Sequence, residues 1–259
     1  MLTEERYKRI LEKLRESQTV SISALVQELN TSESTIRRDL NALDNMGKLI
    51  KVHGGATAID TNFTFIEHNV ETKEKLFIQE KNLIGKYASS TLNEDDFIFI
   101  DAGTTTERMI DFISVKNITV VTNGFTHAEK LAKKGLNCYI LGGHIKNSTE
   151  AIIGSECVMN LQKYNFTKCF LGTNGISLNR GFTTPDIDEA NIKMTAIKNS
   201  FITYILADHS KFDEITSVSF APLDKACIIT DKVLNEKYLK QCTIKEILKW
   251  FIQLHSIQQ

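Results

Sequence analysis

The chain has 259 residues, 42% of them hydrophobic, and its 31 Lys and Arg residues nearly balance its 32 Asp and Glu residues. This composition predicts a soluble globular protein with room for two domains, and the two prolines argue against long disordered linkers. There is no signal peptide pattern and no apolar run of membrane-spanning length, so we expect a cytoplasmic protein without a membrane partner. The five cysteines form no Cys-x-x-Cys pair, which predicts reduced thiols.

Residues 1–57 show the pattern of a winged helix-turn-helix. Apolar side chains recur at helical spacing over residues 4–17 and 22–29, and Asn30-Thr31 breaks the pattern before a third helix. Residues 48–56 then alternate like a short strand and end in a glycine turn. The alternative is an ordinary three-helix domain whose arginines are merely solvated.

The third helix is predicted to enter a DNA groove. Ser32 can cap its first turn, and Ile36, Leu40 and Leu43 share its apolar face. Its opposite face is predicted to contact base edges through Arg38 and its neighbours, while Arg37 is predicted to contact phosphate. The predicted DNA-binding residues are Ser34, Thr35, Arg37, Arg38, Asn41, Lys51 and His53.

Several short motifs together resemble the DeoR family of bacterial transcriptional regulators. They are Arg6 with Ile10, the stretch from Ser32 to Leu40, and His53-Gly54-Gly55-Ala56. The resemblance implies that this domain binds double-stranded operator DNA. Because one recognition helix covers only a few base pairs, we expect a homodimer or homotetramer.

Residues 58–75 are polar and without sustained periodicity, which predicts a linker, and residues 76–248 then alternate between strand and helix patterns. Strands are predicted near 97–100, 118–121, 138–141, 169–171, 201–207 and 226–229, and helices near 78–88, 107–113, 125–134, 155–163 and 188–199. This alternation predicts an α/β fold with a doubly wound, mainly parallel sheet. The tail, residues 249–259, receives no functional interpretation.

Polar, glycine-rich turns follow the predicted strands, where open α/β sheets bind their ligands. The turn from Asp101 to Thr106 opens a helix and offers backbone N–H groups and hydroxyls to an anion, while Lys193 and Lys211 could add positive charge. The alternative is that glycine and threonine are simply common in such turns. No dinucleotide or P-loop motif is present and His and Cys are scattered, so we expect a smaller ligand, no metal and no other cofactor.

Residues 76–248 resemble the DeoR-family effector domain, a relative of ribose-5-phosphate isomerase. The matching positions are Asp101 to Thr105, Thr122-Asn123, Gly142-Gly143, Gly172 to Gly175, Glu189 with Lys193, and Asp208 to Lys211. The resemblance implies a sugar-phosphate sensor. The stretch from Gly181 to Ala190, followed by Ala196-Ile197-Lys198, is most similar to the fructose-operon subgroup, whose expected effector is fructose 1-phosphate.

The predicted effector-binding residues are Asp101, Gly103, Thr104, Thr105, Thr122, Asn123, Gly143, Asn174, Asp186, Glu189, Lys193 and Lys211. The Thr183-Thr184-Pro185-Asp186 loop is the predicted discriminator among sugars. The sequence therefore predicts a repressor of a sugar operon, in particular a fructose operon, that leaves its operator when a sugar phosphate binds.

Three alternatives remain. The effector could be another sugar phosphate, such as tagatose 6-phosphate. A sugar-phosphate isomerase would need an acid or base, and Asp101, Asp186 or Glu189 could serve, although Thr173-Asn174 stands where the related isomerase loop is acidic. An architectural DNA-binding protein without a ligand would leave the polar turns unexplained.

Overall fold

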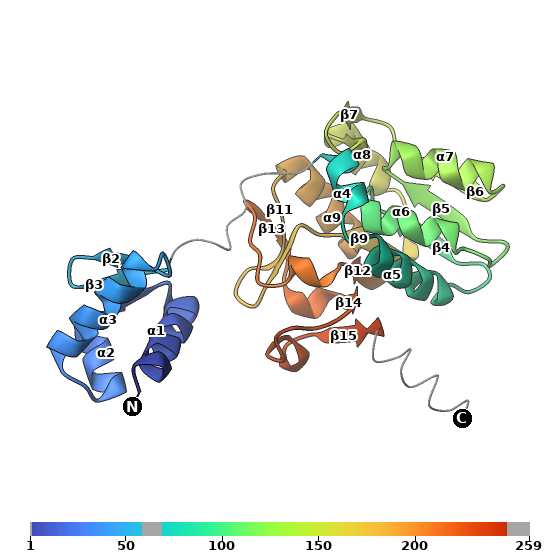
Figure 1. The fold of residues 1–259 in the computed structure, drawn as a ribbon. Helices are drawn as coiled ribbons and strands as arrows, with labels where there is room; N and C mark the ends of the chain where they lie inside the picture. The colour runs from blue at the N-terminus through green and yellow to red at the C-terminus, as the bar shows by residue number, and fades with distance from the viewer. Residues whose placement is uncertain (1, 59–68, 248–259) are drawn as a thin grey trace, which may run out of the picture. The chain divides into compact units, whose positions relative to one another are not determined.

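The computed structural model describes residues 2–58 and 69–247 and divides into two compact units, with the division between residues 62 and 63. The first unit is a winged helix-turn-helix, as predicted (Figure 1). Its elements are α1 (Thr3–Ser17), β1 (Thr19–Ser21), α2 (Ile22–Leu29), α3 (Glu33–Asn45), β2 (Ile50–Val52) and β3 (Gly55–Thr57). The strands form an antiparallel sheet in the order β1-β3-β2.

The first unit packs its three helices around one apolar core. Ile10 of α1, Leu25 of α2 and Ile36 of α3 are almost fully buried there. The predicted cap is present, because the Ser32 hydroxyl accepts a hydrogen bond from the Thr35 N–H at 3.2 Å. This cap satisfies an exposed donor of the first turn and fixes where α3 begins.

The second unit is built on a seven-stranded parallel sheet, which confirms the predicted fold class. Its strands are β4 (Phe97–Ile100), β5 (Thr119–Thr122), β6 (Asn137–Ile140), β9 (Phe166–Gly172), β12 (Ser200–Leu206), β14 (Cys227–Thr230) and β15 (Thr243–Glu246). They lie in the order β15-β14-β12-β9-β4-β5-β6, and each neighbouring pair is parallel.

Helices cover both faces of this sheet (Figure 1). The helices are α4 (Val70–Lys75), α5 (Ile78–Ser90), α6 (Thr104–Asp111), α7 (Phe125–Lys133), α8 (Ser155–Leu161) and α9 (Ile187–Lys198). Consecutive strand residues face opposite sides: in β4, Phe99 joins the core that also holds residues of α8 and α9, whereas Ile98 and Ile100 join the core of α5, α6 and α7. Burial on both faces explains the continuous apolar run of this strand.

Shorter elements complete the second unit. A small antiparallel sheet contains β10 (Gly175–Ser177), β11 (Gly181–Thr184) and β13 (Val218–Ala221), and a hairpin joins β7 (His144–Lys146) to β8 (Ala151–Ile153). Three single-turn 3₁₀ helices are η1 (His209–Lys211), η2 (Leu223–Lys225) and η3 (Tyr238–Lys240).

The chain builds the sheet outward in two directions from β4. It runs first through β5 to β6 on one side and then through β9, β12 and β14 to β15 on the other. The strand order therefore reverses between β4 and β9, and a ligand crevice is expected at the carboxyl ends of these two strands.

The predicted linker is partly structured. Residues 70–75 form α4, and the Val70 N–H donates to the Ser148 carbonyl at 3.0 Å, so this stretch belongs to the second unit. Its polar composition hid the helix because α4 buries none of its side chains. Residues 59–68 and the predicted tail lie outside the described residues. No helix in the described ranges is long and apolar enough to cross a membrane.

Candidate nucleic-acid interface and ligand pocket

The outer face of α3 presents the predicted base-reading residues. Ser34, Arg38 and Asn41 are exposed, on the side of α3 opposite the buried Ile36 and Leu40. The Arg38 guanidinium makes no hydrogen bond or ion pair with any residue that the structure describes. Its five N–H donors are therefore available, and a bidentate contact with guanine is one that such a fork makes well.

Three of the other predicted contacts, Arg37, Lys51 and Thr35, already bond to residues of the unit. Arg37 donates to the Glu33 carboxylate at 2.6 and 3.0 Å, one turn earlier on α3. Lys51 of β2 donates to the Asn41 side-chain oxygen at 2.6 Å, which places this strand beside the outer face of α3. His53 lies in the turn between β2 and β3, and Thr35 shares a hydrogen bond with the capping Ser32 hydroxyl. Because exposed pairs are weak, Arg37 can exchange its partner for a phosphate at small cost.

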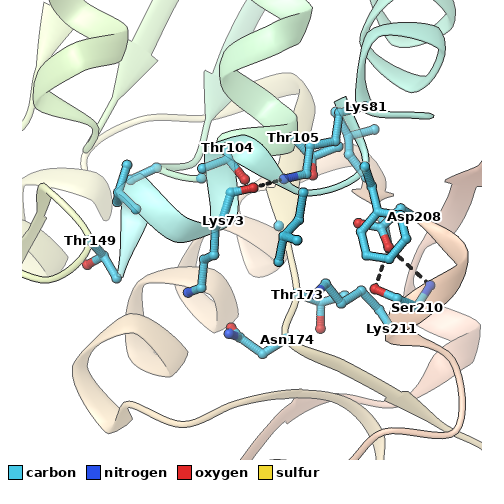
Figure 2. Close-up of a pocket in the computed structure, with 18 of the residues that line it drawn as sticks. Lys73, Lys81, Thr104, Thr105, Thr149, Thr173, Asn174, Asp208, Ser210 and Lys211 are labelled. Carbon is cyan, nitrogen blue, oxygen red and sulfur yellow. Dashed lines mark hydrogen bonds between the residues drawn. The ribbon is translucent and has the colours of Figure 1, made fainter. Parts of the chain in front are cut away.

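A cavity of about 280 Å³ opens at the carboxyl ends of the central strands of the second unit. It lies where the strand order reverses, and the first turn of α6 forms part of its wall (Figure 2). Seven of the predicted effector-binding residues line it: Gly103, Thr104, Thr105, Asn174, Glu189, Lys193 and Lys211. The first turn of α6 has no side-chain cap, so its backbone N–H groups are free to receive an anion.

The other five predicted residues are placed by the structure behind the wall, where they hold it in shape. Asp101 is buried and accepts from the Gly172 N–H at 3.1 Å. Asn123 accepts from the Ala102 N–H, and Thr122 accepts from the Gly124 N–H. The remaining two are Gly143, where a Cβ atom would lie 2.6 Å from the Ile153 oxygen, and Asp186, which caps α9 and pairs with Lys146.

The positive charge of Lys193 is balanced by a carboxylate of the protein itself. Its ammonium pairs with the buried Asp101 carboxylate at the base of the cavity. Burial raises the pKa of Asp101, whereas the pKa of Glu189 is lowered because Lys193 and Lys146 outweigh its burial. Lys193 is thus part of a balanced network, and its charge is less available to a ligand than the sequence suggested.

Lys81 is a cavity cation that the sequence analysis missed. It lies in the first turn of α5, is 4% exposed, and its Nζ donates to the Lys73 carbonyl (Figure 2). Burial lowers its pKa to about 8, and the nearby positive charges of Lys211 and Lys73 add to that shift while Asp208 opposes it. A lysine on the same helical face as the apolar Ile84 and Ala88 was the available signal.

Two buried polar atoms of the cavity have no hydrogen-bond partner among the described residues. They are Oδ2 of Asp208 and Oγ1 of Thr216. The other Asp208 oxygen accepts from the Ser210 N–H and hydroxyl at 3.0 and 2.5 Å. Since buried polar groups are nearly always paired in native proteins, these two atoms mark positions that a bound polar ligand can satisfy.

The predicted sugar-discriminating loop mostly faces away from the cavity. Thr183 and Thr184 are fully buried, and their hydroxyls bond the Thr216 N–H and the Glu189 carboxylate respectively. Within this loop only Pro185 lines the cavity. The loop therefore shapes the wall, whereas Asn174, Asp208 and Thr216 are among the polar residues that line the cavity.

Comparison with known proteins gives concordant matches for both units. Residues 6–62 match the family described as DeoR-like helix-turn-helix domain, and residues 76–232 match the DeoR C terminal sensor domain. The chain is 42% identical over 251 residues to a Bacillus subtilis protein named uncharacterized HTH-type transcriptional regulator FruR, covering 95% of this chain and 99% of that one. It is 35% identical to the B. subtilis transcriptional regulator IolR, over 88% of this chain and 91% of that protein.

Two further matches are more distant. A lactose phosphotransferase system repressor of Staphylococcus aureus is 32% identical, over 90% of this chain and 94% of that one. Among solved structures, ribose 5-phosphate isomerase A from Neisseria gonorrhoeae matches with 18% identity and a TM-score of 0.38, covering 56% of each chain.

Proposed function

Because the chain belongs to the DeoR family of transcriptional regulators, we propose that it represses a fructose-utilisation operon and leaves its operator when fructose 1-phosphate binds the cavity. Its relatives are transcriptional regulators, and it is a regulator rather than an enzyme. It acts in the cytoplasm as a homodimer or homotetramer, since one α3 helix reads only a few base pairs.

The buried Lys81 ammonium beside the first turn of α6 is the observation that supports a phosphorylated effector. Lys73 and Lys211 also line this cavity, so three lysines and the uncapped N–H groups of Thr104 and Thr105 converge on one small space. Such a group of ammonium groups and backbone donors at a helix N-terminus favours an anionic ligand. A phosphate supplies that anion and three strong acceptor oxygens.

The size and polarity of the cavity favour a monosaccharide phosphate. A volume of about 280 Å³ is below that of most drug-sized pockets and is too small for a dinucleotide. Asn174 and the unpaired oxygens of Asp208 and Thr216 also line the cavity and offer contacts to sugar hydroxyls. The likeness of residues 181–190 to the fructose-operon subgroup favours fructose 1-phosphate among such ligands.

The phosphate is needed for energetic reasons. Moving operator occupancy from about 99% to about 1% requires an effector preference of roughly 5.5 kcal/mol for the released state. Neutral hydrogen bonds contribute about 0.5 to 1.5 kcal/mol each, and bonds to charged groups contribute about 1.5 to 3 kcal/mol. Three charge-assisted contacts therefore reach the required range, whereas hydroxyl contacts alone do not.

In DNA recognition, Ser34, Arg38 and Asn41 contact base edges, and Arg37 and Lys51 contact phosphates. The exposure and lack of an internal partner support this role for Arg38. Lys51 holds the Asn41 side chain in position as well, so the two act together.

A gel-shift titration tests the effector. Purified protein on its operator is titrated with fructose 1-phosphate, fructose, tagatose 6-phosphate and deoxyribose 5-phosphate. Release by fructose 1-phosphate alone is expected. Release by tagatose 6-phosphate with none by fructose 1-phosphate would replace the effector and keep the mechanism, and release by unphosphorylated fructose would contradict the role given to the lysines.

A further inference from the structure

The wall of the cavity includes the segment by which the chain enters the second unit. α4 is the first described element after residues 59–68, and its Val70 and Lys73 line the cavity, as do Leu76 and Phe77 directly after it. Figure 2 shows the Lys73 side chain extending from α4 into the cavity. A ligand in the cavity therefore touches the chain that leads to the DNA-binding unit.

α4 has little of its own to hold it in place. It is six residues long and none of its side chains is buried. Its anchors to the unit include the Val70 N–H bonded to the Ser148 carbonyl and the Lys73 carbonyl that accepts from Lys81. Short helices without a buried face are marginal in isolation, so small changes in the surroundings are enough to shift or open α4.

The joint between α4 and α5 is strained. Phe77 connects them in the left-handed region, with φ 54° and ψ 41°. Among the described residues the other non-glycine positions with positive φ are all polar: Gln18, Asn30, Asp95, Asn117, Glu150 and Asp213. A bulky residue adopts this conformation only where its surroundings impose it, and such positions often mark switches.

Packing against η1 holds Phe77 in this conformation. The Phe77 ring meets the His209 ring edge to face, with centroids 5.2 Å apart. His209 is in turn fixed by Asp231, whose two carboxylate oxygens accept from the His209 backbone N–H and from its ring at 2.7 Å each. η1 also carries Ser210 and Lys211, which line the cavity, so the same element supports both the joint and the ligand site.

We propose that α4 transmits effector binding to the DNA-binding unit: Lys73 contacts the effector phosphate directly, and α4 changes its position about Phe77. This inference rests on the proposed function and specifies the segment through which effector binding reaches the DNA-binding unit. Lys73 belongs to α4, whereas Lys81 belongs to α5 and Thr104 to α6, and all three line the cavity. A phosphate bound by these residues together ties α4 to α5 and α6.

A charge-matched pair of variants in the full chain tests the contact. Lys73→Gln removes the cavity cation, while Lys75→Gln removes an exposed cation of the same helix that pairs with Glu71 and does not line the cavity. Fructose 1-phosphate affinity is measured by calorimetry without DNA. Loss of one charge-assisted bond predicts about 10- to 100-fold weaker binding for Lys73→Gln and no more than about 2-fold for Lys75→Gln.

Equal affinities of the two variants would overturn the role of Lys73. If the unsubstituted protein binds no sugar phosphate of the gel-shift panel, the proposed function fails first, and the two failures are thereby distinguished.

Hydrogen exchange of the same proteins tests the movement. Saturating fructose 1-phosphate should slow amide exchange across residues 70–77, with residues 125–133 of α7 as the unaffected reference. The Lys73→Gln protein, saturated by a higher concentration, should lack that protection. Unchanged exchange in α4 of the saturated unsubstituted protein would show that the helix is a fixed wall and refute the transmission route.

Discussion

Replacing Arg6 with alanine should destabilise the DNA-binding unit far more than replacing Arg9. Arg6 of α1 donates two hydrogen bonds to Asp39 of α3, from Nε to Oδ2 at 2.7 Å and from Nη2 to Oδ1 at 3.0 Å. Their side chains are only 13% and 6% exposed. Arg9 pairs with Glu5 on the same helix, and both of those side chains are more than half exposed. The two substitutions thus remove similar ion pairs in opposite environments.

The difference follows from desolvation. Breaking a buried pair costs about 3 to 5 kcal/mol because one charge stays buried without a partner, and the remaining exposure of Arg6 reduces this to about 2 to 4 kcal/mol. An exposed pair one helical turn apart contributes about 0.3 to 0.5 kcal/mol. A unit of this size has a total stability of only about 3 to 9 kcal/mol, so Arg6→Ala removes a large part of it.

Denaturation followed by circular dichroism, together with operator binding, measures the effect. Arg6→Ala should lower the first transition and weaken operator binding, while effector binding by the second unit is retained. An Arg6→Ala, Asp39→Ala double variant should recover part of the loss, since it removes the stranded carboxylate. Equal stabilities of Arg6→Ala and Arg9→Ala would show that burial does not govern this pair.

Arg38→Ala should cost about 1 to 3 kcal/mol of binding free energy on operator DNA and relax the preference at one base pair. Lys51→Ala should weaken binding to operator and random DNA alike and flatten its salt dependence. Binding assays at several salt concentrations measure both effects. Lys81→Met should abolish operator release by fructose 1-phosphate and yet raise the melting temperature of the second unit, because a buried charge is removed; a lowered melting temperature would count against this. Calorimetry should find effector affinity falling from pH 7 to 9 as Lys81, with its pKa of about 8, loses its proton. The stability of the free protein should change in the opposite direction. The pKa of Lys81 in the folded state is about 8, below the ordinary 10.5, so between these pH values the unfolded chain binds more protons than the folded one. The contribution of Lys81 to the free energy of unfolding therefore rises with pH.

Elements with a clear hydrophobic period were predictable from the sequence, and those defined by their partners were not. The apolar run of β4 and the helical stripe of α3 show their structure within a few residues. By contrast, β1 has three residues of which only Val20 is buried, too few to show a period. It is a strand because β3 pairs with it in the antiparallel sheet.

The same distinction applies to the cavity. The turn from Gly103 to Thr105 could be assigned to the ligand-binding edge because the carboxyl ends of parallel strands lie at the same edge of a sheet. Lys73 and Lys81 could not be placed at this edge from the sequence. They lie on α4 and α5, which precede β4, and their approach to the edge depends on how these helices pack. Asp101 was correctly placed at the edge, but the sequence could not show that Lys193 would neutralise it.

The charges around the cavity also bear on whether it could catalyse an isomerisation. Isomerisation requires an acid or base that exchanges protons with the substrate. Here Asp101 is buried against Lys193, and Asn174, which lines the cavity, has no titratable proton. The cavity is therefore suited to binding rather than to proton transfer. In the proposed route, Lys73 lies on the segment leading to the DNA-binding unit, whereas Lys81 and Lys211 lie on the body of the second unit. A phosphate held by both would couple the two, which is what a regulator needs.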